Sequence, residues 1–88
     1  MQIPVFSSRE LGAAVRAVRE RRRLSQTQLA QQAGVERPWL VRLETGRLDN
    51  PTLGKVLDVV DALGCQLELA MKADPAGEPS LDELMGRS

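Results

Sequence analysis

The stretch at residues 25–44, SQTQLAQQAGVERPWLVRLE, predicts two short helices joined by a tight turn. Ser25 can cap the first helix, and Gln28, three residues on, can return the hydrogen bond as in a capping box. Gly34 suits the left-handed backbone that ends a helix, because it has no Cβ to clash. Pro38 fits only the first turn of a helix, so it fixes where the second one begins.

We therefore expect helices at about residues 26–33 and 37–44. Glu36 precedes the second helix, where its carboxylate can accept hydrogen bonds from first-turn amides and suits the positive helix end. Two helices joined by a sharp glycine turn form the unit that places its second helix in the major groove of DNA.

One further helix is expected on each side of this unit. Before it, Ser7 can cap a helix that ends near residue 22, whose core-facing residues are Leu11, Ala14, Val15 and Val18. After it, Asn50 can cap a helix at about residues 51–63 with Pro51 at its first position. Its apolar stripe comprises Leu53, Val56, Leu57, Val60 and Leu63.

Residues 65–72, CQLELAMK, alternate between apolar and polar side chains, as in a half-buried strand. The apolar face comprises Cys65, Leu67, Leu69 and Met71. An unpaired strand exposes backbone groups, so pairing with the same strand of a second copy is the simplest arrangement. The alternative is a hairpin with residues 2–6.

Charge is unevenly distributed along the 88 residues, although the formal net charge is zero. Residues 1–73 carry 11 Lys and Arg against 8 Asp and Glu, whereas residues 74–88 carry 1 against 4. A basic single domain with an acidic tail is expected. The tail has a linker-like composition, and residues 73–88 are either disordered or form a short helix on a partner through Leu81, Leu84 and Met85.

Composition excludes several classes of function. The chain has one cysteine, Cys65, and no histidine. An internal disulfide, a four-ligand zinc site and any nucleophile activated by histidine are therefore excluded. No apolar run approaches the ~20 residues that span a bilayer, and no signal peptide is recognisable. We expect a cytoplasmic, nucleoid-associated protein that is not an enzyme and uses no cofactor or metal.

Residues at fixed spacing carry a resemblance to a known family. Ser25-Gln26, Leu29-Ala30, Gly34-Val35, Leu40 and Glu44 with Gly46 resemble the pattern of the Cro/CI phage-repressor (XRE) helix-turn-helix family, over about residues 11–63. The whole chain is similar to HipB-type antitoxins. The resemblance implies an all-α, lambda-repressor-like domain of four to five helices, with one C-terminal β-strand pairing across a homodimer.

The expected organisation has four parts. These are an N-terminal extension at 1–6, the helix-turn-helix domain at 7–64, the dimerisation strand at 65–72 and a flexible acidic tail at 73–88.

The resemblance also implies site residues. Arg37, Pro38 and Trp39 would lie at the front of the recognition helix, with Arg42 one turn on. Gln26 would bond a phosphate or an outer base, and the further candidates for phosphate contact are Ser25, Thr45 and Arg47. Trp39 is equally compatible with the groove and with the core. Arg19 and Glu44 match a structural ion pair of the family.

The function implied is that of a transcriptional repressor that binds a palindromic operator in double-stranded DNA. As the antitoxin of a type II toxin-antitoxin system, it would also bind a HipA-like serine/threonine kinase toxin. Two alternatives remain open. One is a phage-type or other XRE-family repressor without a kinase partner. The other is a protein-interaction module on the same fold.

Overall fold

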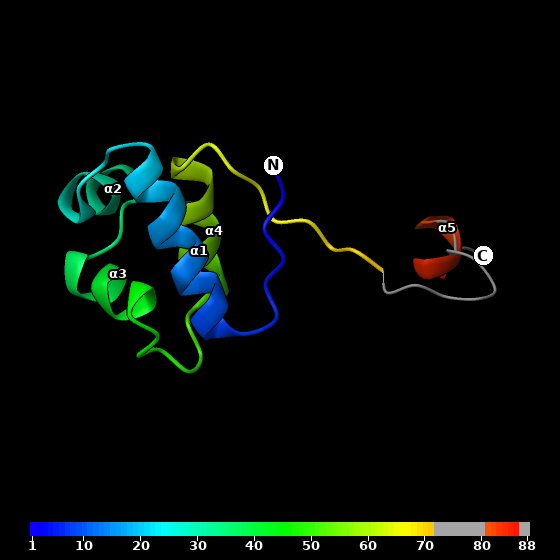
Figure 1. The fold of residues 1–88 in the computed structure, drawn as a ribbon. Coiled ribbons are helices and arrows are strands. Elements are labelled where there is room, and N and C mark those ends of the chain that lie inside the picture. The colour runs from blue at the N-terminus through cyan, green and yellow to red at the C-terminus, as the bar shows by residue number, and fades with distance from the viewer. Residues whose placement is uncertain (72–80, 87–88) are drawn as a thin grey trace.

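The structure is a computed structural model that describes residues 1–71 and 81–86. Its helices, in chain order, are α1 (Ser8–Arg21), α2 (Gln26–Ala33), α3 (Arg37–Glu44), α4 (Leu53–Ala62) and the short α5 (Leu81–Leu84). α1 packs against α3, and α2 packs against both α3 and α4 (Figure 1). The prediction of an all-α helix-turn-helix fold is confirmed.

Local capping chemistry explains where the first two helices begin and end. The Ser7 hydroxyl accepts the Glu10 amide at the start of α1. At the start of α2 both bonds of the predicted capping box with Ser25 are present, with the Ser25 amide donating to Gln28 Oε1 at 2.8 Å. Gly34 ends α2 at φ 70°. α1 ends instead through Arg23, at φ 57°, a left-handed backbone that is uncommon outside glycine.

Two expected caps are absent. Glu36 is the N-cap residue of α3 but makes no side-chain cap bond. α4 begins at Leu53 after Thr52, so Asn50 is not its cap and Pro51 is not its first residue. The loop before α4 is held from outside, because the Ser8 hydroxyl donates to the Asp49 carbonyl at 3.1 Å. This long-range bond cannot be read from local sequence.

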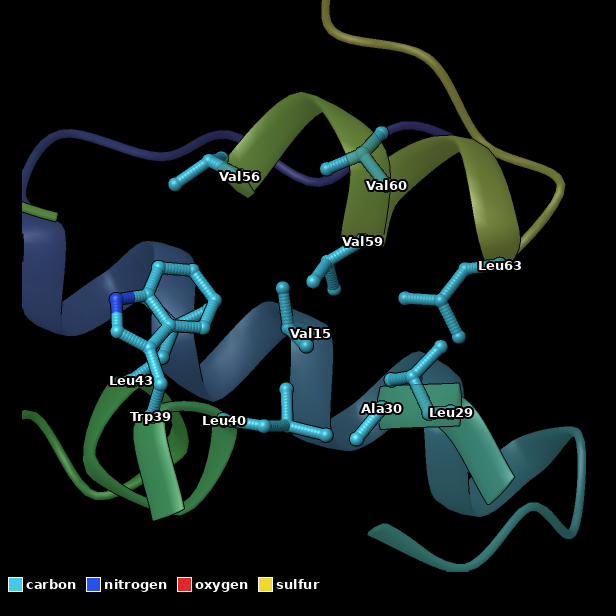
Figure 2. Close-up of a cluster of buried hydrophobic side chains, with 10 residues drawn as sticks. All are labelled: Val15, Leu29, Ala30, Trp39, Leu40, Leu43, Val56, Val59, Val60 and Leu63. Carbon is cyan, nitrogen blue, oxygen red and sulfur yellow. The ribbon is translucent and has the colours of Figure 1, made fainter. Parts of the chain in front are cut away.

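The hydrophobic core lies between α1, α2, α3 and α4 (Figure 2). Its buried side chains are Val15, Leu29, Ala30, Trp39, Leu40, Leu43, Val56, Val59, Val60 and Leu63. The predicted stripe of α4 was partly wrong, since Leu53 is 63% exposed and Leu57 44% exposed. Two overlapping apolar stripes on α4 both fit the 3.6-residue helical period. In the structure, the stripe that contains Val59 is the one that packs into the core.

Gly12 allows α1 and α3 to approach closely. A Cβ built at this position would lie 1.8 Å from the Leu43 carbonyl oxygen, which belongs to the backbone of α3. No side chain larger than hydrogen fits there without moving a helix. Gly12 therefore sets the separation of α1 and α3.

The segments at 1–6 and 65–71 lie outside this packed body and approach each other (Figure 1). The Gln2 amide donates to Glu68 Oε2 at 3.1 Å, but no backbone hydrogen bond joins these two described segments. Within the chain, residues 65–71 therefore form neither the expected strand nor the alternative hairpin. Pairing across a dimer stays a prediction.

The described part of the expected tail is residues 81–86. Leu81–Leu84 form α5, with Leu81 72% exposed and Met85 76% exposed, and the folding of this segment on a partner stays a prediction. The rest of the expected tail, residues 73–80 and 87–88, lies outside the described residues, as does residue 72. In the parts of the chain that the structure describes, no helix is long and apolar enough to cross a membrane.

Candidate nucleic-acid interface

The recognition helix α3 has two distinct faces. Trp39, Leu40, Leu43 and Glu44 are buried against the rest of the fold. Arg37, Pro38 and Arg42 are exposed. The buried face fixes the helix as a rigid unit, whereas the exposed face carries two guanidinium groups suited to guanine or phosphate.

Trp39 belongs to the core rather than to the exposed face. Only 7% of the residue is exposed, and it belongs to the same buried cluster as Leu40 and Leu43, with the indole nitrogen on the ring edge away from Val15 (Figure 2). The Lys55 ammonium lies over the ring, 5.5 Å from the centroid. Of the two alternatives from sequence, the structure has the core position, so Trp39 leaves the set of groove-facing residues.

The predicted ion pair between Arg19 and Glu44 is confirmed, and it is bidentate. Arg19 Nε donates to Glu44 Oε2 at 2.7 Å, and Arg19 Nη2 donates to Glu44 Oε1 at 2.9 Å. The remaining guanidinium nitrogen donates to the Leu24 carbonyl at 2.8 Å. Because 1% of the Glu44 side chain is exposed, water cannot replace either partner. The pair ties the end of α3 to α1 and to the turn before α2.

Hydrogen bonding to Glu44 raises the pKa of Arg19, although burial acts in the opposite direction. The guanidinium thus remains protonated at any pH the protein would meet, and the ion pair does not depend on its titration.

Gln26 joins the same network. Its Nε2 donates to Glu44 Oε1 at 3.2 Å, and the side chain is half-buried. A carboxylate accepts only, so the amide nitrogen must face Glu44 and the amide oxygen must point elsewhere. The orientation of Gln26 is therefore set from inside the protein.

These residues border an open groove between α1, α2 and α3. Its lining comprises Arg16, Arg19, Ser25, Gln26, Thr27, Arg37, Glu44 and Thr45. Arg16 is paired with Glu20 at 3.0 Å, whereas Arg37 makes no hydrogen bond or ion pair within the described residues. The groove opens at the start of α2, where unpaired backbone amides favour an anion.

The remaining candidates for phosphate contact differ in whether they keep a hydrogen-bond donor that is free to bind a phosphate. Ser25 Oγ accepts the Gln28 amide at 3.0 Å and keeps its own proton for donation. The Thr45 hydroxyl already donates to the Val41 carbonyl at 2.8 Å, so it has no proton for a phosphate. Arg47 is exposed beside the end of α3. Ser25 and Arg47 thus remain suited to phosphate, and Thr45 does not.

Sequence reasoning missed Gly12 and Lys55. Glycine inside a helix destabilises it by about 1 kcal/mol relative to alanine, which is a signal of close packing. Lys55 gave no such signal, because its position over Trp39 depends on how α3 and α4 meet.

The chain belongs to a known class of domain. Residues 10–71 match the family model described as "Helix-turn-helix domain". This span is most of the chain, and the chain belongs to that family, a class of DNA-binding regulators.

Individual relatives agree with the class. An uncharacterized HTH-type transcriptional regulator, y4mF, of Sinorhizobium fredii (strain NBRC 101917 / NGR234) is 44% identical over 62 residues, covering 68% of this chain and 78% of the relative. The immunity repressor protein of Bacillus phage phi105 is 39% identical over 57 residues, which cover 65% of this chain and 39% of that repressor.

A solved structure shares the fold. It is a HipB variant in complex with an O2 20-mer, at a TM-score of 0.74 and 22% identity, covering 83% of this chain and all of that one.

Proposed function

We propose that this protein is a transcriptional repressor that binds an inverted-repeat DNA operator as a two-fold dimer. The observation that carries the proposal is the division of α3 into a buried face and an exposed face with Arg37 and Arg42. A helix fixed in this way can enter the major groove with its first turn against base edges. The repressor name of the phage relative supports the same activity.

Base reading falls to the exposed side of α3. Arg37 or Arg42, bidentate to guanine, would contribute about 1–3 kcal/mol of discrimination against the wrong base. Pro38 has no polar side-chain group and can only touch a thymine methyl. One DNA strand would have its phosphates contacted by Ser25, Gln26 and the first-turn amides of α2. Arg47 would contact phosphates of the other strand. Phosphate contacts position the protein, while base contacts specify the sequence.

Dimerisation falls to residues 65–72. The apolar side chains of Leu67, Leu69 and Met71 are exposed in the single chain, Leu69 at 99%. Pairing with the same strand of a second copy would supply backbone partners and cover this face. The two recognition helices would then address half-sites about one helical turn apart, roughly 34 Å.

The particular role we propose is that of a HipB-type antitoxin whose second partner is a HipA-like serine/threonine kinase toxin. Similarity of fold to HipB over that whole chain supports this role. The phage immunity repressor supports the alternative, a repressor without a kinase. Co-purification of the chain with the product of a neighbouring reading frame, followed by an assay of kinase inhibition, separates them. A dimer that binds DNA but captures no kinase would support the repressor function and contradict the antitoxin role.

DNA binding itself is tested with operator sequences selected from a random pool and with a mixed-sequence duplex. Arg42→Ala is expected to reduce the preference for the selected sequence, whereas Arg47→Ala is expected to weaken binding to both duplexes alike. Binding should fall steeply with salt because counterions are released. Equal binding of selected and random DNA by the unmodified protein would contradict a sequence-specific repressor. Binding that ignores salt would favour a protein-interaction module.

A further inference from the structure

Lys55 occupies a position that the isolated fold does not favour. It is the third residue of α4, where the aligned peptide dipoles already make the helix end positive. No acidic residue lies in that first turn. Lys55 also has no ion pair in the described part of the chain, and its ammonium instead lies over the Trp39 ring at 5.5 Å. A cation is thus held beside a positive helix end without a counter-charge.

The same corner of the molecule holds unused hydrogen-bond donors. Thr52, the N-cap of α4, makes no side-chain cap bond. Trp39 is 7% exposed, and its indole N–H makes no hydrogen bond within residues 1–71 and 81–86 but reaches solvent, because no buried side-chain nitrogen or oxygen in those residues lacks a partner. Figure 2 shows the indole nitrogen on the ring edge that faces out of the core. The Lys55 ammonium, at the positive end of α4 and without a counter-charge among the described residues, favours an anion as its partner.

The anion can be identified from the place of this corner. Trp39 lies in the first turn of α3, the same turn as exposed Arg37 and Pro38. A helix about 10–12 Å across fills a major groove about 12 Å wide. Groups beside the first turn of the recognition helix therefore meet the walls of the groove, which are phosphates.

We propose that Lys55 is a DNA-phosphate contact, positioned by the ring of Trp39, on the α4 side of the recognition helix. This inference rests on the proposed function and adds a residue that the motif does not contain. Trp39 acts as a positioning residue, because its ring restricts the lysine side chain by a cation–π contact. Neither group reads a base.

The test measures how the affinity of the full-length protein for a mixed-sequence duplex depends on salt. Each phosphate contact that is lost lowers the slope of log K against log salt by about 0.9. Lys55→Gln should therefore reduce the slope by about one and weaken binding to every sequence alike. Lys55→Arg keeps the charge over the ring and should restore the slope.

The matched control is Arg21→Gln. It removes one unit of charge from an exposed position at the end of α1, where the guanidinium contacts only Met1 Sδ, at 3.6 Å. It should change the slope much less than Lys55→Gln. Equal changes for both variants, or no change for Lys55→Gln, would overturn the proposal while the repressor function stands. A wild-type protein that binds no duplex would overturn both. Circular dichroism verifies that each variant is folded, and since Lys55 is exposed it is not needed for the core.

Discussion

The helical body, residues 8–63, and the flanking segments, 1–6 and 65–71, use their apolar residues in opposite ways. In the body, Leu29, Leu40 and Val59 have no exposed surface at all. In the flanks, Phe6 is 82% exposed and Leu69 99% exposed. The body buries most of its apolar side chains within one chain, with Leu53 and Leu57 as exceptions, whereas the described flanks keep theirs exposed. Stability should therefore depend on the body, and association on the flanks.

The largest expected effect is on the buried ion pair. Glu44→Gln leaves the Arg19 guanidinium without its counter-charge and should lower the free energy of unfolding by about 4 kcal/mol. The pKa of Arg19 is raised in the folded protein. The stabilisation that its charge gives to the fold is therefore fully present below the ordinary pKa of arginine and is lost only at higher pH. The deficit measured by urea unfolding should then be the same at pH 7 and pH 10. Glu68→Gln, which touches only exposed Gln2 and Gln66, should change little.

Close packing of α1 on α3 gives the next effect. Gly12→Ala places a methyl against the Leu43 carbonyl and should destabilise the body by about 3 kcal/mol, through strain and displaced helices. Gly54→Ala is the control, because a Cβ there meets nothing within 4 Å and a helical alanine is favoured. Thermal unfolding should show a lower melting temperature for Gly12→Ala and a higher one for Gly54→Ala. Equal melting temperatures would show that α1 and α3 can separate without loss.

Relief of backbone strain should give a smaller gain. Arg23 ends α1 at φ 57°, where a Cβ is unfavourable. Arg23→Gly should raise the free energy of unfolding by about 0.5 kcal/mol, the gain being reduced by the greater freedom of glycine in the unfolded chain. Denaturant unfolding at low protein concentration measures it. A loss of stability would mean that the Arg23 side chain stabilises the body through contacts that outweigh the strain.

The smallest effect on folding is expected in the flanks. Leu69→Ala should change the stability of the single chain by less than about 0.5 kcal/mol, because the side chain is already exposed. Its effect should appear in sedimentation instead, as a weaker dimer. A large loss of stability that does not depend on protein concentration would contradict the division between body and flanks.

The same division explains what could be predicted from the sequence. Features fixed by neighbouring residues were predicted correctly, such as the capping box of Ser25 and the left-handed Gly34. The Arg19–Glu44 pair spans 25 residues and followed only from the resemblance to a family.

Features decided by packing between distant helices were not predictable. The burial of Trp39 and the exposure of Leu57 depend on which side of a helix meets the core, and two apolar stripes were compatible with the pattern. The loop before α4 is held by a hydrogen bond from the Ser8 hydroxyl to the Asp49 carbonyl, far away in the chain. Local sequence carries no trace of such contacts.

The separation of the two faces of α3 has an evolutionary consequence. The buried residues hold the helix in place, and none of them lies on its exposed face; they are Trp39, Leu40, Leu43 and Glu44. Arg37 and Arg42 can therefore be exchanged without disturbing the scaffold, whereas Pro38 also marks the start of α3. With α3 reading DNA as proposed, descendants of one gene could acquire new target sequences by a few substitutions on its exposed face, while the fold is inherited unchanged.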